Sequence, residues 1–184
     1  MKKHCITACL YTVITAVALG IVYPLLITGL AHIAFRDKAE GQLITHNGDV
    51  IGSKLIGQPF TGAGYFHSRP SSAGSGYDAS SSSGSNLAPS NKQLIDRVNS
   101  SVTTESIGNV DIPVDLVTAS GSGLDPDISP AAALYQVPRV AHARNLPDTK
   151  VRELVMSHVK MRQFGLLGEP RVNVLELNLA LSKQ

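Results

Sequence analysis

Hydrophobic side chains form an uninterrupted run near the start of the chain, from Cys5 to Ala31, with no Asp, Glu, Lys or Arg. As a helix rising about 1.5 Å per residue, this run is roughly 40 Å long, which exceeds the roughly 30 Å hydrocarbon thickness of a bilayer. A single helix pairs its backbone polar groups internally, as a lipid environment requires. The pattern therefore predicts one transmembrane helix, with a distortion at Pro24 because proline removes a helix hydrogen bond.

Two other interpretations of this run stay open. A basic tip followed by apolar residues is also typical of a cleavable signal peptide, and Ala16-Val17-Ala18 has the form of a cleavage site. The apolar run continues, however, well beyond the about 15 residues at which a cleaved segment normally stops. A buried core helix is the third interpretation, but core helices of this length without a polar face are rare.

Shorter patterns after the span predict a small amount of β-structure. Residues 43–46 and 49–51 alternate around Asn47-Gly48, which is typical of a hairpin with a type I′ turn. Residues 54–56 are predicted to extend this sheet. Residues 112–118 and 171–181 are predicted as strands, the last with a bulge at Val174-Leu175 that keeps both sets of apolar residues buried.

Three helices are predicted among these strands. The first covers residues 92–101 after an N-cap at Ser90, with Leu94, Ile95 and Val98 facing inward, and the second covers 131–143 after Ser129-Pro130, with a bend at Pro138. The third is capped by Asp148 and ended by Gly165 and Gly168. With Phe60 and Phe66 as core anchors, the predicted fold class is an α+β soluble domain anchored by a single N-terminal transmembrane helix. Its parts are a cytoplasmic tip (1–4), the span (5–31) and an exported domain (32–184).

Charge and cysteine content narrow the functional classes. Lys2 and Lys3 account for the formal net charge of +2, because the other 14 of the 16 basic side chains balance the 14 acidic ones. The soluble part therefore has no net positive charge, and nucleic-acid binding is not indicated. Both cysteines, Cys5 and Cys9, lie in the apolar run, so no disulfide can link parts of the soluble domain.

Motifs for catalysis are few. The chain has no Gly-x-x-x-x-Gly-Lys phosphate-binding loop and no Asp-Lys-Thr-Gly phosphorylation motif. Ser120 and Ser122 lie in a glycine-rich stretch that lacks the spacing of a nucleophile elbow, so a hydrolase using either serine with His67 or His142 is only a rival interpretation. Asp125 and Asp127, near Asp111 and Asp115, could offer oxygen atoms to a hard cation, although the regular spacing of a calcium loop is missing.

The loops themselves are distinctive. Residues 71–86 consist mainly of serine and glycine, a composition typical of a flexible linker, yet Tyr77 and Asp78 interrupt it. Six blocks stand out in order along the chain: Gly52–Gln58 (GSKLIGQ), Tyr65–Ser71 (YFHSRPS), Ser83–Asn91 (SGSNLAPSN), Val117–Pro126 (VTASGSGLDP), Arg139–Ala141 (RVA) and Val172–Leu181 (VNVLELNLAL). Together with the N-terminal span, these blocks strongly resemble the C subunit of the bacterial Kdp high-affinity potassium-transporting P-type ATPase.

The resemblance implies an accessory, noncatalytic subunit in the bacterial inner membrane. The short tail before the span predicts a cytoplasmic N-terminus and an exported C-terminal domain. The resemblance implies two partners, a potassium-channel-like translocating subunit and a P-type ATPase subunit, and a role in their assembly. It also implies a role as a catalytic chaperone that raises the ATP affinity of the ATPase subunit. ATP, Mg²⁺ and potassium would be used by the complex, with no catalytic residue, cofactor or metal on this chain.

Candidate contact residues follow from the loops and the span. We expect partner contacts within Gly62–Asn91 and Thr118–Ser129; the individual candidates are Gly20, Pro24, Gly29, Arg69, Asn86, Ser120 and Asp125. The weakest candidate is a nucleotide contact at Ser83, Gly84, Ser85 and Asn86. An exported loop would not meet cytoplasmic ATP. A membrane-tethered serine hydrolase and a binding module secreted after cleavage at Ala18 are the alternative functions.

Overall fold

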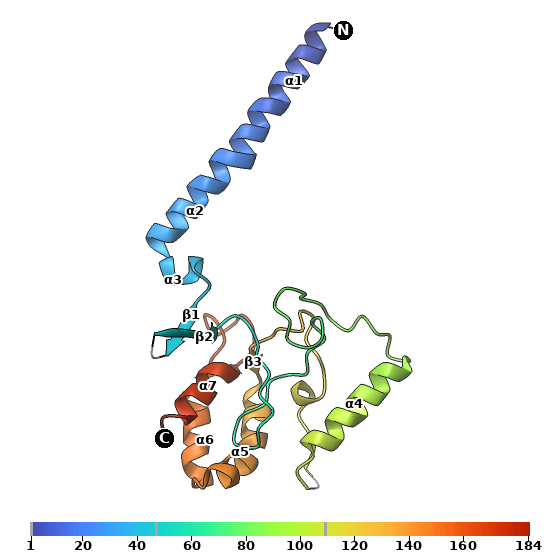
Figure 1. Cartoon of the computed structure of the whole chain (residues 1–184), viewed down its shortest axis with the longest axis vertical. Helices are drawn as coiled ribbons and strands as arrows, with labels where there is room; N and C mark the ends of the chain where they lie inside the picture. The colour runs from blue at the N-terminus through green and yellow to red at the C-terminus, as the bar shows by residue number, and fades with distance from the viewer. Residues whose placement is uncertain (1, 47, 109) are drawn as a thin grey trace. The chain divides into compact units, whose positions relative to one another are not determined.

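The fold combines several helices with two small sheets, and one long apolar helix stands at the N-terminus (Figure 1). The computed structural model describes residues 2–46, 48–108 and 110–184. The chain divides into two units, Met1–Ser53 and Lys54–Gln184. This mixture of elements confirms the predicted fold class.

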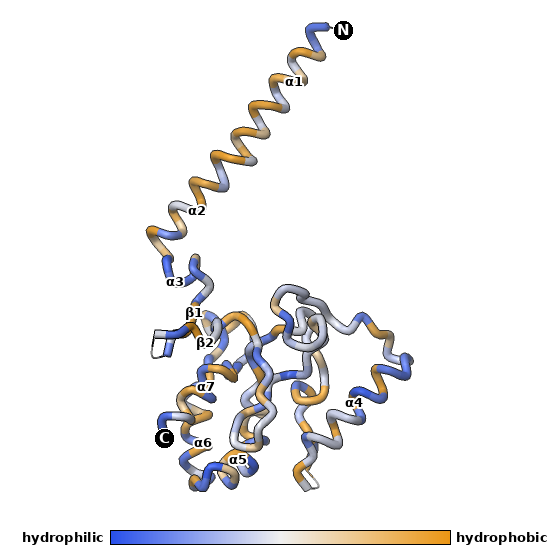
Figure 2. Tube along the Cα trace, in the orientation of Figure 1, coloured by the Kyte–Doolittle hydropathy of each residue, from blue (hydrophilic) through white to orange (hydrophobic). Residues whose placement is uncertain are grey.

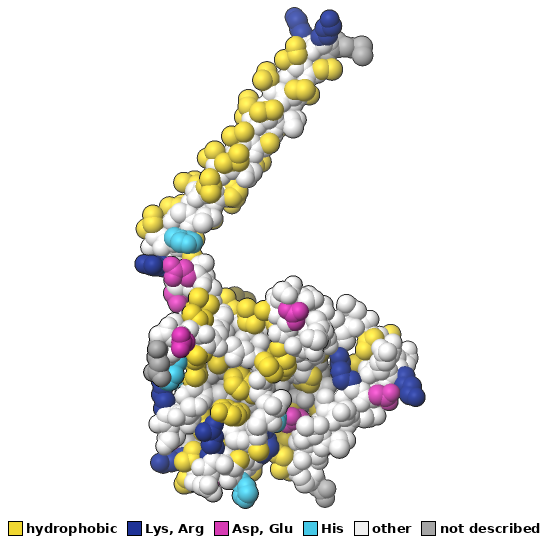
Figure 3. Space-filling model, in the orientation of Figure 1, with side chains coloured by type: hydrophobic (Ala, Val, Ile, Leu, Met, Phe, Trp, Pro, Cys, Tyr) yellow, Lys and Arg dark blue, Asp and Glu magenta, His cyan; other side chains and the backbone are white. Residues whose placement is uncertain are grey.

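The first unit begins with a helix of 33 residues, Lys2–Ala34, which is long and apolar enough to cross a membrane. It comprises α1 (Lys2–Val17), one π-helical turn η1 (Ala18–Val22) and α2 (Tyr23–Ala34). Apolar residues continue along most of its length (Figure 2), and their side chains recur all along its visible surface, with basic side chains at the N-terminal end (Figure 3). The helix is longer at both ends than the predicted span.

The π-helical turn explains how this helix accommodates Pro24. Proline cannot donate to the carbonyl four residues before it, and its ring would collide with that carbonyl, which here belongs to Gly20. In η1 the turn is widened, so that the Tyr23 backbone N–H donates to the Ala18 carbonyl five residues earlier. The distortion predicted at Pro24 therefore takes the form of a π-turn.

A short helix and a hairpin complete the first unit. After α3 (Arg36–Ala39), β1 (Leu43–His46) pairs antiparallel with β2 (Asp49–Ser53), with a register shift between Ile44 and Thr45. The predicted hairpin is thus confirmed. Asn47 lies outside the described residues, so the predicted type I′ turn stays a prediction.

The second unit is organised around three helices and a three-stranded sheet. α5 (Pro130–Arg144) packs on α6 (Asp148–Ser157), and α6 packs on α7 (Val174–Leu181). The strands β3 (Asp127–Ile128), β4 (Val159–Lys160) and β5 (Arg171–Asn173) form an antiparallel sheet in the order β3-β5-β4. α5 begins as predicted, with Ser129 as its N-cap and proline in its first turn.

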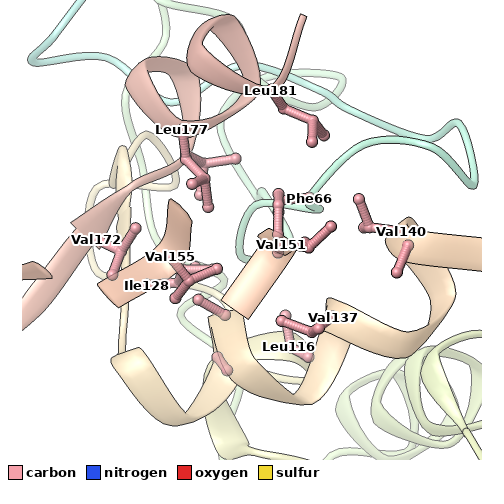
Figure 4. Close-up of a cluster of buried hydrophobic side chains, with 14 residues drawn as sticks. Phe66, Leu116, Ile128, Val137, Val140, Val151, Val155, Val172, Leu177 and Leu181 are labelled. Atoms are coloured by element: carbon pink, nitrogen blue, oxygen red, sulfur yellow. The ribbon is translucent and has the colours of Figure 1, made fainter. Parts of the chain in front are cut away.

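The core of this unit lies between these helices and the sheet (Figure 4). Phe66, the largest fully buried side chain, comes from an irregular segment rather than from a helix or strand. Phe60 is partly buried and packs against the same core, so both predicted anchors are confirmed. The other core side chains labelled in Figure 4 are Leu116, Ile128, Val137, Val140, Val151, Val155, Val172, Leu177 and Leu181.

Helix α4 (Lys92–Glu105) has no buried residue. Its N-cap is Asn91, whose side chain accepts from the Gln93 N–H at 2.8 Å, rather than the predicted Ser90. Leu94 and Val98 are half-buried, but Ile95 is exposed, contrary to prediction.

The chain end 171–181 is the largest correction. Only Arg171–Asn173 is a strand, and α7 follows at once in place of the predicted bulged strand. The Asn173 side chain caps this helix by accepting from the Glu176 N–H at 3.0 Å. Val174, Leu177 and Leu181 then lie on one buried face at helical spacing, which the alternation of leucines along the sequence obscured.

Three smaller predictions are also wrong. Residues 54–56 form a turn rather than a third hairpin strand, and residues 114–116 form a 3₁₀ turn, η2 (Val114–Leu116), rather than a strand. Pro113 precedes that turn, and the Asp115 carboxylate accepts a hydrogen bond from the Ser129 N–H at 2.8 Å. Both features favour a tight turn. α6 follows Pro147 with no side-chain cap from Asp148 and ends at Ser157, because Val159 pairs with Val172 in the sheet.

Candidate functional site

The serine–glycine loop (residues 71–86) is an ordered structure rather than a linker. The Ser71 hydroxyl accepts hydrogen bonds from the Ala73 N–H at 3.2 Å and the Tyr77 N–H at 2.8 Å. The same hydroxyl donates to the Gly123 carbonyl at 2.6 Å. One serine therefore organises the first half of this loop and joins it to the second glycine-rich loop, residues 118–126.

The two loops pack backbone against backbone. Ser82 donates to the Ser122 carbonyl of the second loop at 3.0 Å, and within the first loop Ser83 donates to the Ser72 carbonyl at 3.0 Å. Gly123 has a φ of +68°, and a Cβ atom there would lie 2.6 Å from both the Ala73 nitrogen and the Ser83 oxygen. Only glycine fits between these two backbones. We call residues 71–86 and 118–126 together the paired loops.

Arg69 and Asp125 link the paired loops to the rest of the second unit, Lys54–Gln184, which we call the head. The Arg69 guanidinium donates to Asp125 Oδ2 at 3.1 Å, while Asp125 Oδ1 accepts from the Asp127 N–H at 3.0 Å. The Tyr77 hydroxyl donates to the Arg69 carbonyl at 2.6 Å. Burial, aided by the negative charge of Glu105, raises the pKa of Tyr77 to about 12, so this hydroxyl stays a donor.

Charged side chains of both signs near Asp125 line a cavity of about 370 Å³. Its lining residues are Arg69, Asp115, Asp125, Asp127, Ile128, Ser129, Glu169, Pro170 and Arg171. Burial raises the pKa of Asp127, partly offset by the Arg171 guanidinium 2.9 Å away. The Asp125 and Asp127 carboxylates both have arginine partners, and Asp115 binds a backbone N–H. Among the described residues, no group of three His, Cys, Asp or Glu side chains could hold a metal ion, so the cation prediction gains no support.

The geometry does not assemble a hydrolytic site from the residues that the rival interpretation names. His67 Nδ1 lies 2.8 Å from Glu105 Oε1, and its Nε2 lies 3.3 Å from the Gly62 carbonyl oxygen. The hydroxyl oxygens of Ser120 and Ser122 lie 3.4 Å apart. Within residues 2–46, 48–108 and 110–184, neither serine forms a hydrogen bond with a histidine, and His142 is exposed on α5.

Two buried amides position the segment that leads into the serine–glycine loop. The Asn178 side chain accepts from the Phe66 N–H at 2.8 Å and donates to the Phe66 carbonyl at 2.9 Å. Gln136 does the same for His67, accepting at 2.7 Å and donating at 3.2 Å. These amides take the place of a neighbouring strand, because each satisfies both backbone groups of one residue.

The sequence patterns did not identify Gln136 and Asn178 as structurally important residues. The available signal was a polar amide among apolar residues, as Asn178 is between Leu177 and Leu179. A buried amide requires partners, so such a position predicts a specific contact. No local pattern indicates which backbone supplies it.

The contact roles expected of the remaining candidate residues stay predictions. Gly20 and Gly29 lie on the long helix, and a methyl group added at either position would meet no atom within 4 Å apart from the backbone of its own helix and its chain neighbours, so their faces are open. Asn86 has a φ of +51°, and Gly84 approaches the Gly121 carbonyl so closely that a Cβ atom would lie 3.0 Å from it. The Ser83 hydroxyl is bonded within the loop. A nucleotide contact at residues 83–86 likewise stays a prediction.

The two units define a class: a head of paired, internally bonded loops, joined to one helix with the length and composition of a membrane span. The model of the family "K+-transporting ATPase, c chain" (KdpC) matches residues 5–183. The chain belongs to this family.

Curated relatives agree over nearly the whole length. The chain is 63% identical over 181 residues to the "Potassium-transporting ATPase KdpC subunit" of Acidobacterium capsulatum, covering 98% of both chains. It is 60% identical over 184 residues to the protein of the same name from Koribacter versatilis, covering 98% of this chain and 95% of the relative. A third such relative, from Rhodospirillum rubrum, is 53% identical over 169 residues, covering 90% and 88%. The resemblance found in the sequence is confirmed.

Proposed function

We propose that this chain is an accessory, noncatalytic subunit that stabilises a potassium-transporting P-type ATPase complex. Its partners are a potassium-channel-like translocating subunit and an ATP-hydrolysing subunit. The observation that carries the proposal is the packing of the paired loops. Most of their hydroxyl groups form hydrogen bonds within the head. A rigid surface of this kind loses little conformational entropy on binding, so it suits a structural contact better than chemistry.

The chain is anchored in the bacterial inner membrane by a single pass. We infer a cytoplasmic tip with an exported head; the basic residues at the two helix ends, Lys2 and Lys3 against Arg36 and Lys38, are equal in number and do not decide the orientation. Labelling of a cysteine placed at Ser157, which is exposed, by a membrane-impermeant reagent on intact spheroplasts tests this topology. Labelling before lysis supports it; labelling only after lysis contradicts it. The mass of the mature chain tests whether cleavage after Ala18 occurs.

The chain influences ATP hydrolysis without contacting ATP. Any increase in the ATP affinity of the catalytic subunit is transmitted through the span and the head, because an exported loop does not meet cytoplasmic nucleotide. The internal bond of Ser83 and the close packing of Gly84 on Gly121 support this view. A photoreactive ATP analogue that labels residues 80–86 in the intact complex would overturn it.

A bulky residue at Gly29 tests the role of the span in assembly. The space around Gly29 is open within the chain, so leucine fits the isolated helix and can clash only with another molecule. We expect Gly29→Leu to reduce co-purification of the partner subunits from detergent-solubilised membranes. Ala31→Leu, about 200° away around the same helix, is the matched control and retains the partners. Equal recovery with both variants refutes contact through the Gly29 face.

A further inference from the structure

A turn between β4 and β5 exposes an unusual number of large apolar side chains. In residues 161–168, Met161 is 71% exposed, Phe164 86%, Leu166 80% and Leu167 60%. Single exposed apolar residues are ordinary, but four within eight residues concentrate exposed apolar surface in one turn. Exposure of this surface to water is unfavourable, so it indicates a binding site. We call residues 161–168 the apolar turn.

The backbone holds the apolar turn in one shape. Gln163 and Leu167 exchange two hydrogen bonds, with N···O distances of 2.8 Å and 2.9 Å. Gly165 and Gly168 have φ values of +73° and +75°, and Phe164 itself has a φ of +55°. Because the left-handed region is unfavourable for a bulky residue, its use at the most exposed side chain means that the fold imposes this conformation.

Charges beside the apolar turn are already neutralised within the chain. Arg162 pairs with Glu169 at 2.6 Å, Lys160 pairs with Glu176 at 2.5 Å, and Arg171 pairs with Asp127 at 2.9 Å. Insertion into a lipid surface is usually supported by free basic side chains, and the basic side chains beside this turn are paired. A turn with paired neighbouring charges, a fixed backbone and an exposed aromatic side chain instead matches the centre of a protein–protein interface.

We infer that the apolar turn inserts into an apolar pocket on a partner subunit of the transport complex, with Phe164 and Leu166 as its anchors. The inference rests on the proposed function and adds the contact surface and the chemistry of its partner. The partner surface is concave, apolar and poor in unpaired charge, because any charge facing this turn would be desolvated without a counter-ion. The ion pairs of Lys160, Arg162 and Arg171 lie beside the contact.

Site-specific crosslinking in the full complex tests this inference. A photoreactive amino acid replaces Phe164 in the full chain in membranes, and the same substitution at Val114, 64% exposed in another part of the head, is the control. We expect a crosslink from position 164 to a subunit that also co-purifies with the wild-type chain, at a yield at least about tenfold above that from position 114. A crosslink to lipid alone, or equal yields at both positions, overturns the inference.

A substitution tests the energetic role of the same turn. Phe164→Ser combined with Leu166→Ser should lower recovery of partner subunits at least about tenfold, whereas Val110→Ser combined with Val114→Ser leaves recovery unchanged. Both pairs are exposed, so the melting temperature of the head should not fall in either variant. Full recovery with the first variant overturns the inference and leaves the proposed function intact. Failure of the wild-type chain to recover any partner overturns the proposed function itself.

Discussion

Gly123 is the position where the packing of the paired loops can be tested most sharply. In Gly123→Ala the added Cβ would lie 2.6 Å from the Ala73 nitrogen and from the Ser83 oxygen, both backbone atoms. The φ of +68° adds about 1–2 kcal/mol of strain for alanine. If the loops separate, the 2.6 Å bond from Ser71 to the Gly123 carbonyl is also lost, at about 1 kcal/mol. We expect a total destabilisation of about 2–3 kcal/mol.

Thermal unfolding of the full chain in detergent, followed by circular dichroism, measures this effect. At about 4 °C per kcal/mol, Gly123→Ala should lower the melting temperature of the head by about 8–12 °C. Gly121→Ala in the same loop is the matched control, since no atom lies within 4 Å of its added methyl group and its φ is not in the left-handed region. That variant should melt within about 2 °C of the wild type. Equal melting temperatures for the two variants would refute the claim that the paired loops are tightly packed.

Three further variants test individual contacts by thermal unfolding. Asn178→Leu should destabilise the head by about 2–4 kcal/mol, because it leaves both backbone groups of Phe66 buried and unpaired; a loss below about 1 kcal/mol contradicts the assigned role. Tyr77→Phe should cost about 1 kcal/mol through the loss of its 2.6 Å bond to a backbone carbonyl, and an unchanged melting temperature argues against that bond. Burial alone would raise the pKa of Glu176, but its bond to Lys160 and the nearby lysine charges lower it below 4.5. Its stabilising contribution is therefore present above pH 4.5 and lost as the pH falls through the lowered pKa, so the difference between Glu176→Gln and wild type should shrink below pH 4.5; a constant difference contradicts this.

The parts of the fold that sequence patterns predicted are those determined by local chemistry. The span followed from 27 consecutive uncharged residues, and the start of α5 from Ser129-Pro130, because capping and proline geometry act within one turn. The prediction for residues 171–181 was wrong because the positions of its leucines fit both the strand period of two residues and the helical period of 3.6. Asn173 and Glu176, at the spacing of an N-cap and the third helical residue, were the local signal for α7.

The site depended on contacts that sequence patterns could not supply. Composition alone suggested a linker at 71–86, whereas hydroxyl and glycine contacts with residues far along the chain make it an ordered loop. The bond between Phe66 and Asn178 joins residues 112 positions apart. Such pairings arise from the tertiary fold, so no local pattern identifies them. The resemblance to a family did identify these loops as significant, without indicating how they pack.

Affinity purification of the full chain from detergent-solubilised membranes, followed by identification of every co-purifying chain, tests the central claim most directly. The account predicts recovery with a channel-like translocating subunit and an ATPase subunit, in a fraction that hydrolyses ATP in response to potassium. Recovery of the chain alone, soluble in water without detergent and turning over a substrate by itself, would contradict it.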